Sequence, residues 1–161
     1  MLRALDLALL RLMRTRGHPP ALERTVQALT RTGEHSVIWY ALAGMGMALD
    51  SERRAVYRRA ALIVLGVDVA NAVVKLAIGR PRPVLEGLPA LTRTMSERSY
   101  PSAHASTSFA GARVLSEAIS PPAVYSLAAA MALSRPYLGV HYPSDVVAGA
   151  LFGDALARLS A

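Results

Sequence analysis

Cysteine is absent from this 161-residue chain, and lysine occurs only once, at Lys75. Without cysteine the protein can form neither a disulfide framework nor a thiolate metal site. Lysine and arginine together number 18 against 11 acidic residues, so the formal net charge is +7 and nearly all of the positive charge is arginine. A chain with this charge is expected to bind an anionic partner.

Regular alternation of polar and apolar residues is also lacking, so no strand is predicted and the expected fold class is all-α. Apolar residues make up 53% of the chain, more than in an ordinary soluble domain. The arginines interrupt apolar segments and do not gather on one polar face with aromatic stacking groups. This pattern argues against a nucleic-acid partner and favours a membrane protein with basic residues near lipid phosphates.

The first sixteen residues place leucines at helical spacing, but Arg3, Asp6 and Arg11 interrupt any continuous apolar stretch. A signal peptide is therefore not predicted. We expect an amphipathic helix that lies in the membrane interface, with a surface helix packed on the bundle as the alternative. Residues 17–33 are polar and are predicted to form a linker with one short helix at most.

Five helices are predicted to follow, over residues 36–49, 60–79, 102–119, 122–134 and 143–159. The first contains about fourteen uncharged residues, fewer than the roughly 20 that a bilayer core requires. Residues 80–101 form a long connection, of a length typical of functional or disordered loops. The chain is thus interpreted as one domain, 1–161, with an interfacial segment 1–33 and a helical bundle 34–161.

Small residues in the last predicted helix include Gly149 and Gly153, which would allow another helix to approach closely. Packing inside the bundle is expected, and dimerisation is the alternative. Two ionisable residues, Asp68 and Arg113, fall inside apolar segments, where a lone charge normally faces the bundle interior. They are predicted to approach each other, with Glu117 as the competing partner of Arg113.

A first cluster of ionisable residues lies in "SRPYLGVHYPSD", residues 134–145. Arg135 and His141 are predicted to lie in a loop between helices, with Asp145 in the first turn of the next helix. A carboxylate that holds one imidazole nitrogen leaves the lone pair of the other nitrogen free. His141 could then act as a nucleophile, although a purely structural hydrogen bond would use the same residues.

Two further clusters are "PSAH" and "KLAIGRPRP". In the first, Ser102, Ala103 and His104 open a helix whose amides could bind an anion or simply be capped. In the second, Lys75 ends a helix and Arg82 follows in the loop, a pattern that a snorkelling lysine and a solvated arginine would also give. Helices that alternate in direction bring all three clusters to one end of the bundle. Cations around two histidines there predict a phosphate site.

These three clusters, in this order and spacing, resemble the signatures of the type 2 phosphatidic acid phosphatase superfamily, K-x6-RP, PSGH and SR-x5-H-x3-D. The resemblance extends from about residue 36 to the C-terminus and departs from the pattern where Ala103 replaces the glycine of PSGH. It implies a haloperoxidase-like helical phosphatase without metal or other cofactor, in which His141 attacks phosphorus, Asp145 orients it and His104 protonates the leaving oxygen. The groups implied to hold the phosphate are Lys75, Arg82, Ser102, Ala103 and Arg135.

The expected function is therefore a multi-pass membrane phosphatase that hydrolyses a lipid phosphate through a phosphohistidine. A polyprenyl-linked substrate such as decaprenylphosphoryl-5-phosphoribose is expected. The alternatives are phosphatidic acid, phosphatidylglycerophosphate, undecaprenyl pyrophosphate, vanadate-dependent haloperoxidase activity and a non-catalytic protein that binds lipid headgroups. The arginines of the first segment favour an active site on the cytoplasmic side, near anionic lipids.

Overall fold

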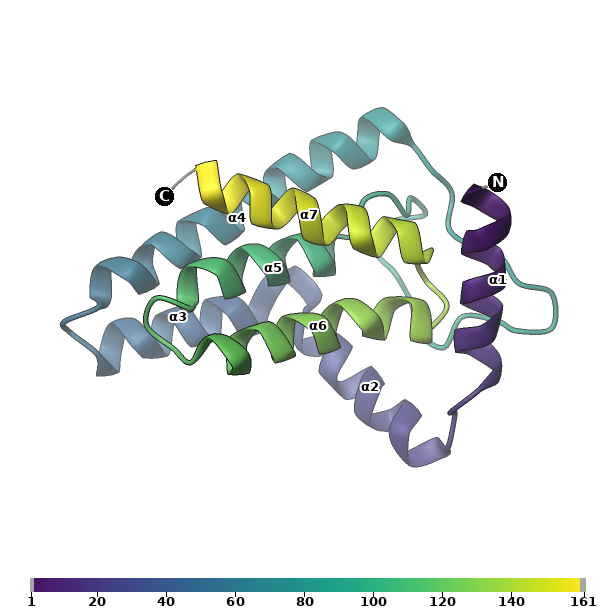
Figure 1. The fold of residues 1–161 in the computed structure, drawn as a ribbon, viewed down its shortest axis with the longest axis horizontal. Coiled ribbons are helices and arrows are strands. Elements are labelled where there is room, and N and C mark those ends of the chain that lie inside the picture. The colour runs from purple at the N-terminus through teal and green to yellow at the C-terminus, as the bar shows by residue number, and fades with distance from the viewer. Residues whose placement is uncertain (1, 160–161) are drawn as a thin grey trace.

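The computed structural model describes residues 2–159, which fold into seven α-helices and one short 3-10 helix (Figure 1). No named strand occurs in this range, and its single β-bridge joins Pro81 to Arg98. The all-α prediction is confirmed. Residues 1 and 160–161 of the predicted domain lie outside the described part. The helices are α1 (Leu2–Thr15), α2 (Pro20–Thr32), η1 (Glu34–Ser36), α3 (Val37–Leu49), α4 (Arg54–Ile78), α5 (Ala103–Leu115), α6 (Pro121–Tyr137) and α7 (Pro143–Leu159).

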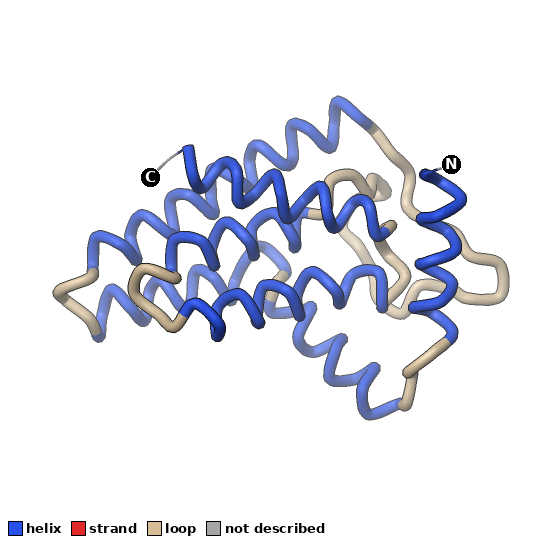
Figure 2. The backbone as a smooth tube through the Cα atoms, in the orientation of Figure 1, coloured by secondary structure: helices blue, strands red, loops and turns tan. Residues whose placement is uncertain are grey.

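Helices α3 to α7 run side by side as a bundle, and α1 crosses the end of the bundle near α7 and α6 (Figure 1). Helix α2 continues below α6 and connects through η1 to α3. The long loop 79–102 lies at the same end as α1 and appears in tan in Figure 2. The connections that carry the three sequence clusters therefore meet at one end of the bundle, as predicted.

Helix α5 is the centre of the bundle and packs against α4, α6 and α7. It is built mainly from alanine, serine and glycine, which allow neighbouring helices to approach its backbone. Trp39 of α3 fills the space beside Gly111, and its Nε1 donates a hydrogen bond of 3.0 Å to Ser108 Oγ. Asn71 of α4 donates to Ser106 Oγ at 2.9 Å. Buried side-chain hydrogen bonds thus fix the register of α3 and α4 on α5.

The last helix approaches α5 through its glycines. A Cβ atom at Gly149 would lie 2.6 Å from the Ser102 carbonyl oxygen, and one at Gly153 would overlap the Ser106 carbonyl. These two glycines are therefore used inside the bundle. The prediction of packing within the chain is confirmed.

Two predicted element boundaries are wrong. The expected linker 17–33 contains the thirteen-residue helix α2, which begins with Pro20 at a position where the missing amide hydrogen costs no helical bond. Helix α6 continues past Ser134 to Tyr137, because Pro136 falls in the last turn and the amide of Leu138 still bonds to the Ser134 carbonyl at 2.9 Å. Arg135 is thus held by a helix and not by a loop.

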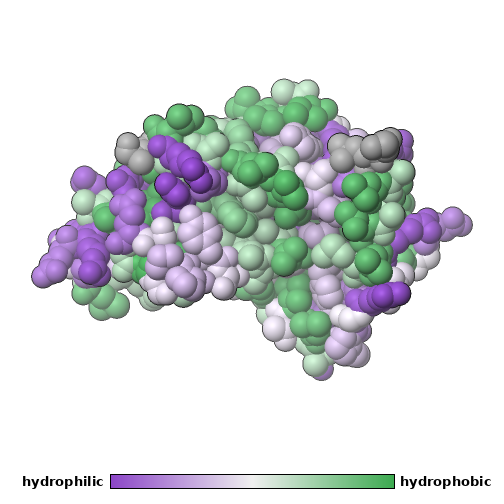
Figure 3. Space-filling model, viewed as in Figure 1, coloured by the Kyte–Doolittle hydropathy of each residue, from purple (hydrophilic) through white to green (hydrophobic). Residues whose placement is uncertain are grey.

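Helix α4 is the one helix among residues 2–159 that is long and apolar enough to cross a membrane. Its exposed face carries large apolar side chains, and Gly79, with φ 65°, ends the helix in the left-handed conformation. Figure 3 shows apolar surface over the middle of the molecule and hydrophilic residues gathered at the end opposite α1. The exposed apolar residues of α4 are Leu62, Leu65, Val69, Val73, Leu76 and Ile78.

Candidate active site

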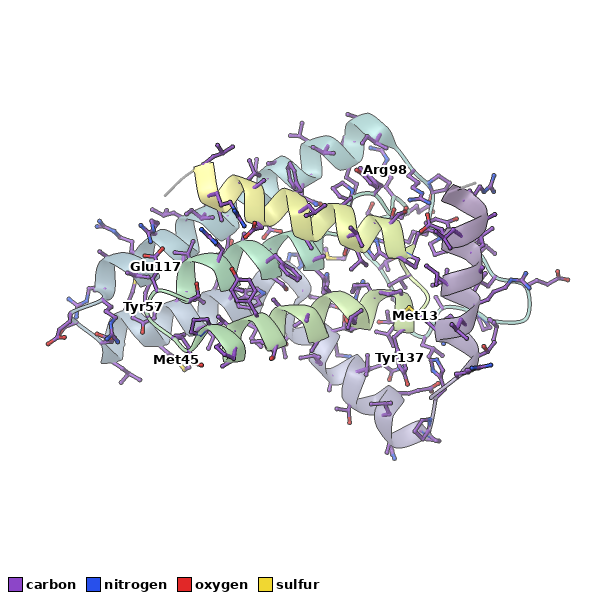
Figure 4. The ribbon with its side chains drawn as sticks, in the orientation of Figure 1. Met13, Met45, Tyr57, Arg98, Glu117 and Tyr137 are labelled. Atoms are coloured by element: carbon purple, nitrogen blue, oxygen red, sulfur yellow. The ribbon has the colours of Figure 1, made fainter. Side chains whose placement is uncertain are left out.

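A cavity of about 620 Å³ opens where the C-termini of α4 and α6 meet the N-terminus of α5. It lies at the end of the bundle that Arg98 and Tyr137 mark in Figure 4. Six of the eight predicted site residues line this cavity: Lys75, Arg82, Ala103, His104, Arg135 and His141. Asp145 lies behind His141 and is fully buried, and Ser102 is fully buried at the start of α5.

The contact of His141 with Arg82 defines its tautomer. Arg82 Nη1 lies 3.0 Å from His141 Nε2, and because a guanidinium nitrogen can only donate, Nε2 must carry the lone pair. The proton is then on Nδ1, which faces Asp145 Oδ2 at 3.5 Å. Burial lowers the pKa of His141 well below its usual value, and the nearby cations, first Arg135, lower it further. His141 is therefore a neutral imidazole with a nucleophilic Nε2.

Asp145 is held in the first turn of α7 by several donors. Its Oδ2 accepts a hydrogen bond from the amide of Tyr142 at 3.0 Å, and its Oδ1 accepts one from Arg80 Nη1 at 2.7 Å. Arg80 also stacks on the ring of Tyr142, with its guanidinium carbon 4.0 Å from the ring centroid. These contacts keep the carboxylate facing His141.

The network continues into α1, because Arg80 Nη2 donates to Asp6 Oδ2 at 2.8 Å. Asp6 also accepts hydrogen bonds from the amide of Ser144 at 2.9 Å and from its hydroxyl at 2.6 Å. Burial would raise the pKa of Asp6, but the hydrogen bonds from Ser144 and Arg80 outweigh it and hold this pKa below its usual value. Asp6 is thus a buried anion, and it holds Arg80, which contacts Asp145.

His104 has the opposite tautomer. Its Nε2 lies 3.1 Å from the carbonyl oxygen of Thr30, and because a carbonyl can only accept, this nitrogen carries a proton. Nδ1 is then the nitrogen free to exchange a proton with a bound molecule. The site therefore pairs a nucleophile that uses Nε2 with an acid or base that uses Nδ1.

Three cations surround the two histidines. Arg135 is 4% exposed, and its Nη1 donates to the hydroxyl of Thr30. Arg82 Nε donates to the Ser96 carbonyl at 2.6 Å, and burial lowers the pKa of its guanidinium to about 10. Lys75 comes from the last turn of α4. Buried cations with donors still available favour a bound phosphate.

In the PSAH segment, Ser102 is fully buried and does not line the cavity. Its Oγ accepts a hydrogen bond from the amide of Ala105 at 3.4 Å, so its hydroxyl acts as the N-cap of α5. Ala103 does line the cavity and is not among the residues with positive φ, so alanine fits in place of the family's glycine without backbone strain.

Asp68 and Ser36 also line the cavity. Asp68 projects from α4, and its Oδ2 accepts a hydrogen bond from Ser36 Oγ at 2.9 Å. The predicted approach of Asp68 to Arg113 is wrong, because Arg113 is exposed and Glu117 instead pairs with Arg59. Helix α5 turns its arginine to the surface because its buried face is taken up by small residues packed on α4 and α7.

Sequence reasoning missed four residues that hold the site. Arg80 contacts Asp145, and Asp6 holds Arg80. Thr30 contacts both His104 and Arg135. Arg14 of α1 donates to the carbonyl oxygen of Pro89 at 2.7 Å and so holds the long loop. The eight-residue spacing of Asp6 and Arg14 was a usable signal, since it places both on one helix face. Thr30 offered none, because its role depends on a backbone carbonyl.

Metal binding has no obvious place in the described structure. Among residues 2–159 no group of three or more His, Asp or Glu side chains could share a metal ion.

A family model described as the PAP2 superfamily matches residues 56–161, about two thirds of the chain, and the chain belongs to this superfamily. It is a phosphatase. It is 37% identical over 130 residues to the decaprenylphosphoryl-5-phosphoribose phosphatase of Mycolicibacterium smegmatis, which covers 81% of this chain and 72% of that protein. The enzyme of the same name from Mycobacterium tuberculosis (strain ATCC 25618 / H37Rv) is 38% identical over 138 residues, which cover 83% of this chain and 76% of the relative.

Two crystal structures share the fold at 24% sequence identity. Aquifex aeolicus LpxE has a TM-score of 0.79, with 97% of this chain and 94% of that chain covered. The transmembrane PAP2-type phosphatidylglycerolphosphate phosphatase of Bacillus subtilis has a TM-score of 0.77, with 99% and 84% covered. These two likenesses show the fold that this chain shares with both proteins.

Proposed function

We propose that this protein hydrolyses the phosphomonoester of a polyprenyl-linked pentose phosphate, of the kind named for its relatives, decaprenylphosphoryl-5-phosphoribose. The observation that carries the proposal is that relatives with one and the same activity match more than four fifths of this chain at 37–38% identity. The cavity agrees with such a substrate, because Asp68 and Ser36 line it together with the cations. A carboxylate and a hydroxyl are suitable partners for the hydroxyl groups of a sugar.

The first half of the reaction forms a phosphohistidine. His104 enters this step protonated on both ring nitrogens. Nε2 of His141 attacks phosphorus, the bond from phosphorus to the alkoxide oxygen breaks, and His104 gives its Nδ1 proton to that oxygen. Arg82 donates to His141 Nε2 in the free enzyme and transfers this hydrogen bond to a phosphate oxygen when the substrate binds. Lys75 and Arg135 neutralise the other oxygens as negative charge develops on them.

The second half releases phosphate. His104, now neutral, takes a proton from a water molecule that attacks the phosphorus of the phosphohistidine. The bond from phosphorus to Nε2 breaks, and inorganic phosphate leaves. Asp145 faces the Nδ1 proton of His141 throughout and stabilises the positive charge that the imidazole carries in the intermediate.

The helices α3 to α7 are proposed to cross the membrane several times, because α7 also exposes apolar residues such as Val147 and Leu151. Helix α1 exposes Leu5, Leu9 and Leu12 beside the active site and is proposed to lie in the interface. We place this end on the cytoplasmic side, where arginines of α1 meet anionic lipids. A single cysteine introduced at the exposed Glu86 tests on which side of the membrane the active site lies. Labelling of this cysteine by an impermeant reagent in intact cells would place the active site outside.

Substrate choice is tested with a panel of lipid phosphates in detergent micelles, with release of inorganic phosphate as the measurement. We expect the highest kcat/KM on polyprenyl-phosphoryl-5-phosphoribose, lower values on phosphatidic acid, phosphatidylglycerophosphate and undecaprenyl pyrophosphate, and no effect of EDTA. Equal or better turnover of phosphatidic acid would overturn the substrate. EDTA-sensitive turnover would overturn the metal-independent mechanism.

Substrates with different leaving groups distinguish the roles of the two histidines. His141→Ala should abolish turnover of every substrate. His104→Ala should lose about 10²- to 10⁴-fold on an alkyl phosphate and much less on p-nitrophenyl phosphate, whose leaving group departs without a proton. Equal losses on both substrates would contradict the acid role of His104.

A further inference from the structure

Thr30 is a fully buried residue in the last turn of α2. It lies outside the span 56–161 that matches the superfamily, and no signature includes it. Yet it contacts two of the residues that line the cavity, through different atoms. Its carbonyl oxygen lies 3.1 Å from His104 Nε2, and its hydroxyl accepts a hydrogen bond from Arg135 Nη1.

The contact with the Thr30 carbonyl determines which nitrogen of His104 can exchange a proton with the substrate. Because a carbonyl oxygen has no proton to give, Nε2 keeps its proton as long as the bond to Thr30 is made. Proton exchange with substrate is then left to Nδ1. An imidazole that turned away from Thr30 would lose both this assignment and its fixed orientation.

The hydroxyl contact determines how Arg135 is presented. One guanidinium nitrogen is held by Thr30 Oγ1, and Ser134 Oγ lies 3.2 Å from the same hydroxyl. The Nε of Arg135 is buried and has no hydrogen-bond partner in the described structure.

Gly33, the residue after α2, shows how closely this helix approaches His104. A Cβ atom at Gly33 would lie 2.7 Å from Cδ2 of His104 and 3.1 Å from its Nε2, and 2.5 Å from Sδ of Met131. Gly33 has φ −85°, so glycine is required there by space and not by backbone conformation. The end of α2 is therefore fitted against the imidazole ring.

We propose that Thr30 is a positioning residue of the phosphatase reaction: its carbonyl fixes His104 as an acid that works through Nδ1, and its hydroxyl fixes Arg135 for the phosphate. When His141 Nε2 bonds to phosphorus and the bond to the alkoxide oxygen breaks, the proton moves from His104 Nδ1 to that oxygen. The acid and a phosphate-binding cation are thus set by one residue of the N-terminal segment. This inference rests on the proposed roles of His104 and Arg135.

The carbonyl half is tested with Gly33→Ala, which pushes the ring of His104 away from Thr30. The matched control is Gly44→Ala in α3, where an added Cβ meets nothing within 4 Å. Gly33→Ala should lose about 10²-fold or more on an alkyl phosphate, as expected when general acid catalysis is lost, and little on p-nitrophenyl phosphate. Gly44→Ala should match the wild type on both.

The hydroxyl half is tested with Thr30→Val, which keeps the shape and the carbonyl and removes only the hydroxyl. Vanadate should inhibit this variant about 10- to 100-fold less well, because a charge-assisted hydrogen bond to a phosphate-binding guanidinium is lost. The ratio of alkyl to aryl phosphate turnover should not change. Thr30→Ser should restore inhibition, and Thr25→Val is the matched control, since that exposed hydroxyl bonds only to the Ala21 carbonyl of its own helix.

Nitrogen NMR of histidine-labelled protein reads the tautomer without any turnover. The wild type and Thr30→Val should show His104 protonated at Nε2, and Gly33→Ala should lose this signature. If His104 is found protonated at Nδ1 alone in the wild type, or if Thr30→Val binds vanadate as the wild type does, the inference is wrong. If His104→Ala itself shows no leaving-group dependence, the proposed function of His104 fails instead.

Discussion

The N-terminal helices α1 and α2 and the bundle α3 to α7 meet at one cavity but contribute different groups to it. The bundle and its loops supply the two histidines and the three cations that line the cavity. The N-terminal helices supply buried groups that hold these residues in place, at Asp6, Arg14 and Thr30. The reacting groups lie in spaced signatures, whereas three of their supports are single residues of a segment outside the family match.

The two faces of helix α1 differ in polarity. Its inward face carries Asp6, Leu10 and Arg14, which are buried, while Leu5, Leu9 and Leu12 are exposed. An ordinary surface helix of a soluble protein buries leucines and exposes charges. Helix α1 instead buries two charged residues beside Leu10 and exposes leucines beside Arg3 and Arg11. This arrangement agrees with the proposed position of α1 between a polar site and a lipid interface.

The sharpest test of the comparison is Asp145→Asn in the bundle. An asparagine would present an amide donor to His141 and favour the proton on Nε2, which removes the nucleophilic lone pair. A fall in kcat of about 10³- to 10⁴-fold is expected, with KM nearly unchanged. Steady-state kinetics on p-nitrophenyl phosphate and on the lipid substrate measure it. A loss smaller than tenfold would mean that Asp145 does not orient the nucleophile.

The same difference explains what the sequence could predict. The positions of Lys75, Arg82, His104, Arg135 and His141 in one cavity followed from helical periodicity and alternating direction, and the structure places all five there. Local patterns suffice for such residues because each signature lies within about a dozen positions. Helix ends were predicted less well, since the helix expected to end at Ser134 continues through Arg135 to Tyr137.

The supports could not be read from the chain in this way. The hydrogen bond between Asp6 and Arg80 joins residues 74 positions apart. The hydrogen bond between Thr30 and His104 also spans 74 positions, and its acceptor is a backbone carbonyl. A backbone acceptor leaves no mark in the choice of side chain. Ser102 lies within a signature and also supports the fold, because its hydroxyl caps α5, one of the two roles that the sequence left open.

A substitution that affects only the scaffold separates stability from chemistry within the bundle. Gly153→Ala places a methyl group on the Ser106 carbonyl and should destabilise the protein by about 1–3 kcal/mol. Thermal denaturation in detergent measures it, with Gly66→Ala as the control, because a Cβ there meets nothing within 4 Å. The folded fraction of Gly153→Ala should retain the wild-type ratio of alkyl to aryl phosphate turnover. A change in that ratio would show that the α5–α7 contact reaches the acid.

Asp6→Asn tests the N-terminal side of the same network. The variant keeps the size of the side chain and loses charge-assisted hydrogen bonds from Arg80 and Ser144, so a loss of about 2 kcal/mol at neutral pH is expected. Since the folded protein holds the pKa of Asp6 below its usual value, this stabilisation is present above about pH 4 and is lost as the pH falls through the lowered pKa.

Denaturation midpoints of the wild type and Asp6→Asn should therefore converge at acid pH. The control is Asp154→Asn, whose carboxylate pairs with Arg158 on the surface of α7 and should shift the midpoint little at any pH. If Asp6→Asn lowered kcat as far as Asp145→Asn does, the division between reacting groups and supports would be wrong. A difference that persisted unchanged at pH 3 would instead show that the charge of Asp6 is not what stabilises the protein.

The smallest effect is expected at the end of the bundle opposite α1, where Glu117 is labelled in Figure 4. Glu117 pairs with Arg59 of α4, and the two side chains are 49% and 36% exposed. Exposed ion pairs contribute about 0–1 kcal/mol, because water and salt screen them. Glu117→Gln should therefore change the denaturation midpoint only slightly, and less at high salt than at low salt. Its kcat/KM should equal that of the wild type, since no described contact links this pair to the cavity; a change above twofold would mean that the two ends of the bundle are coupled.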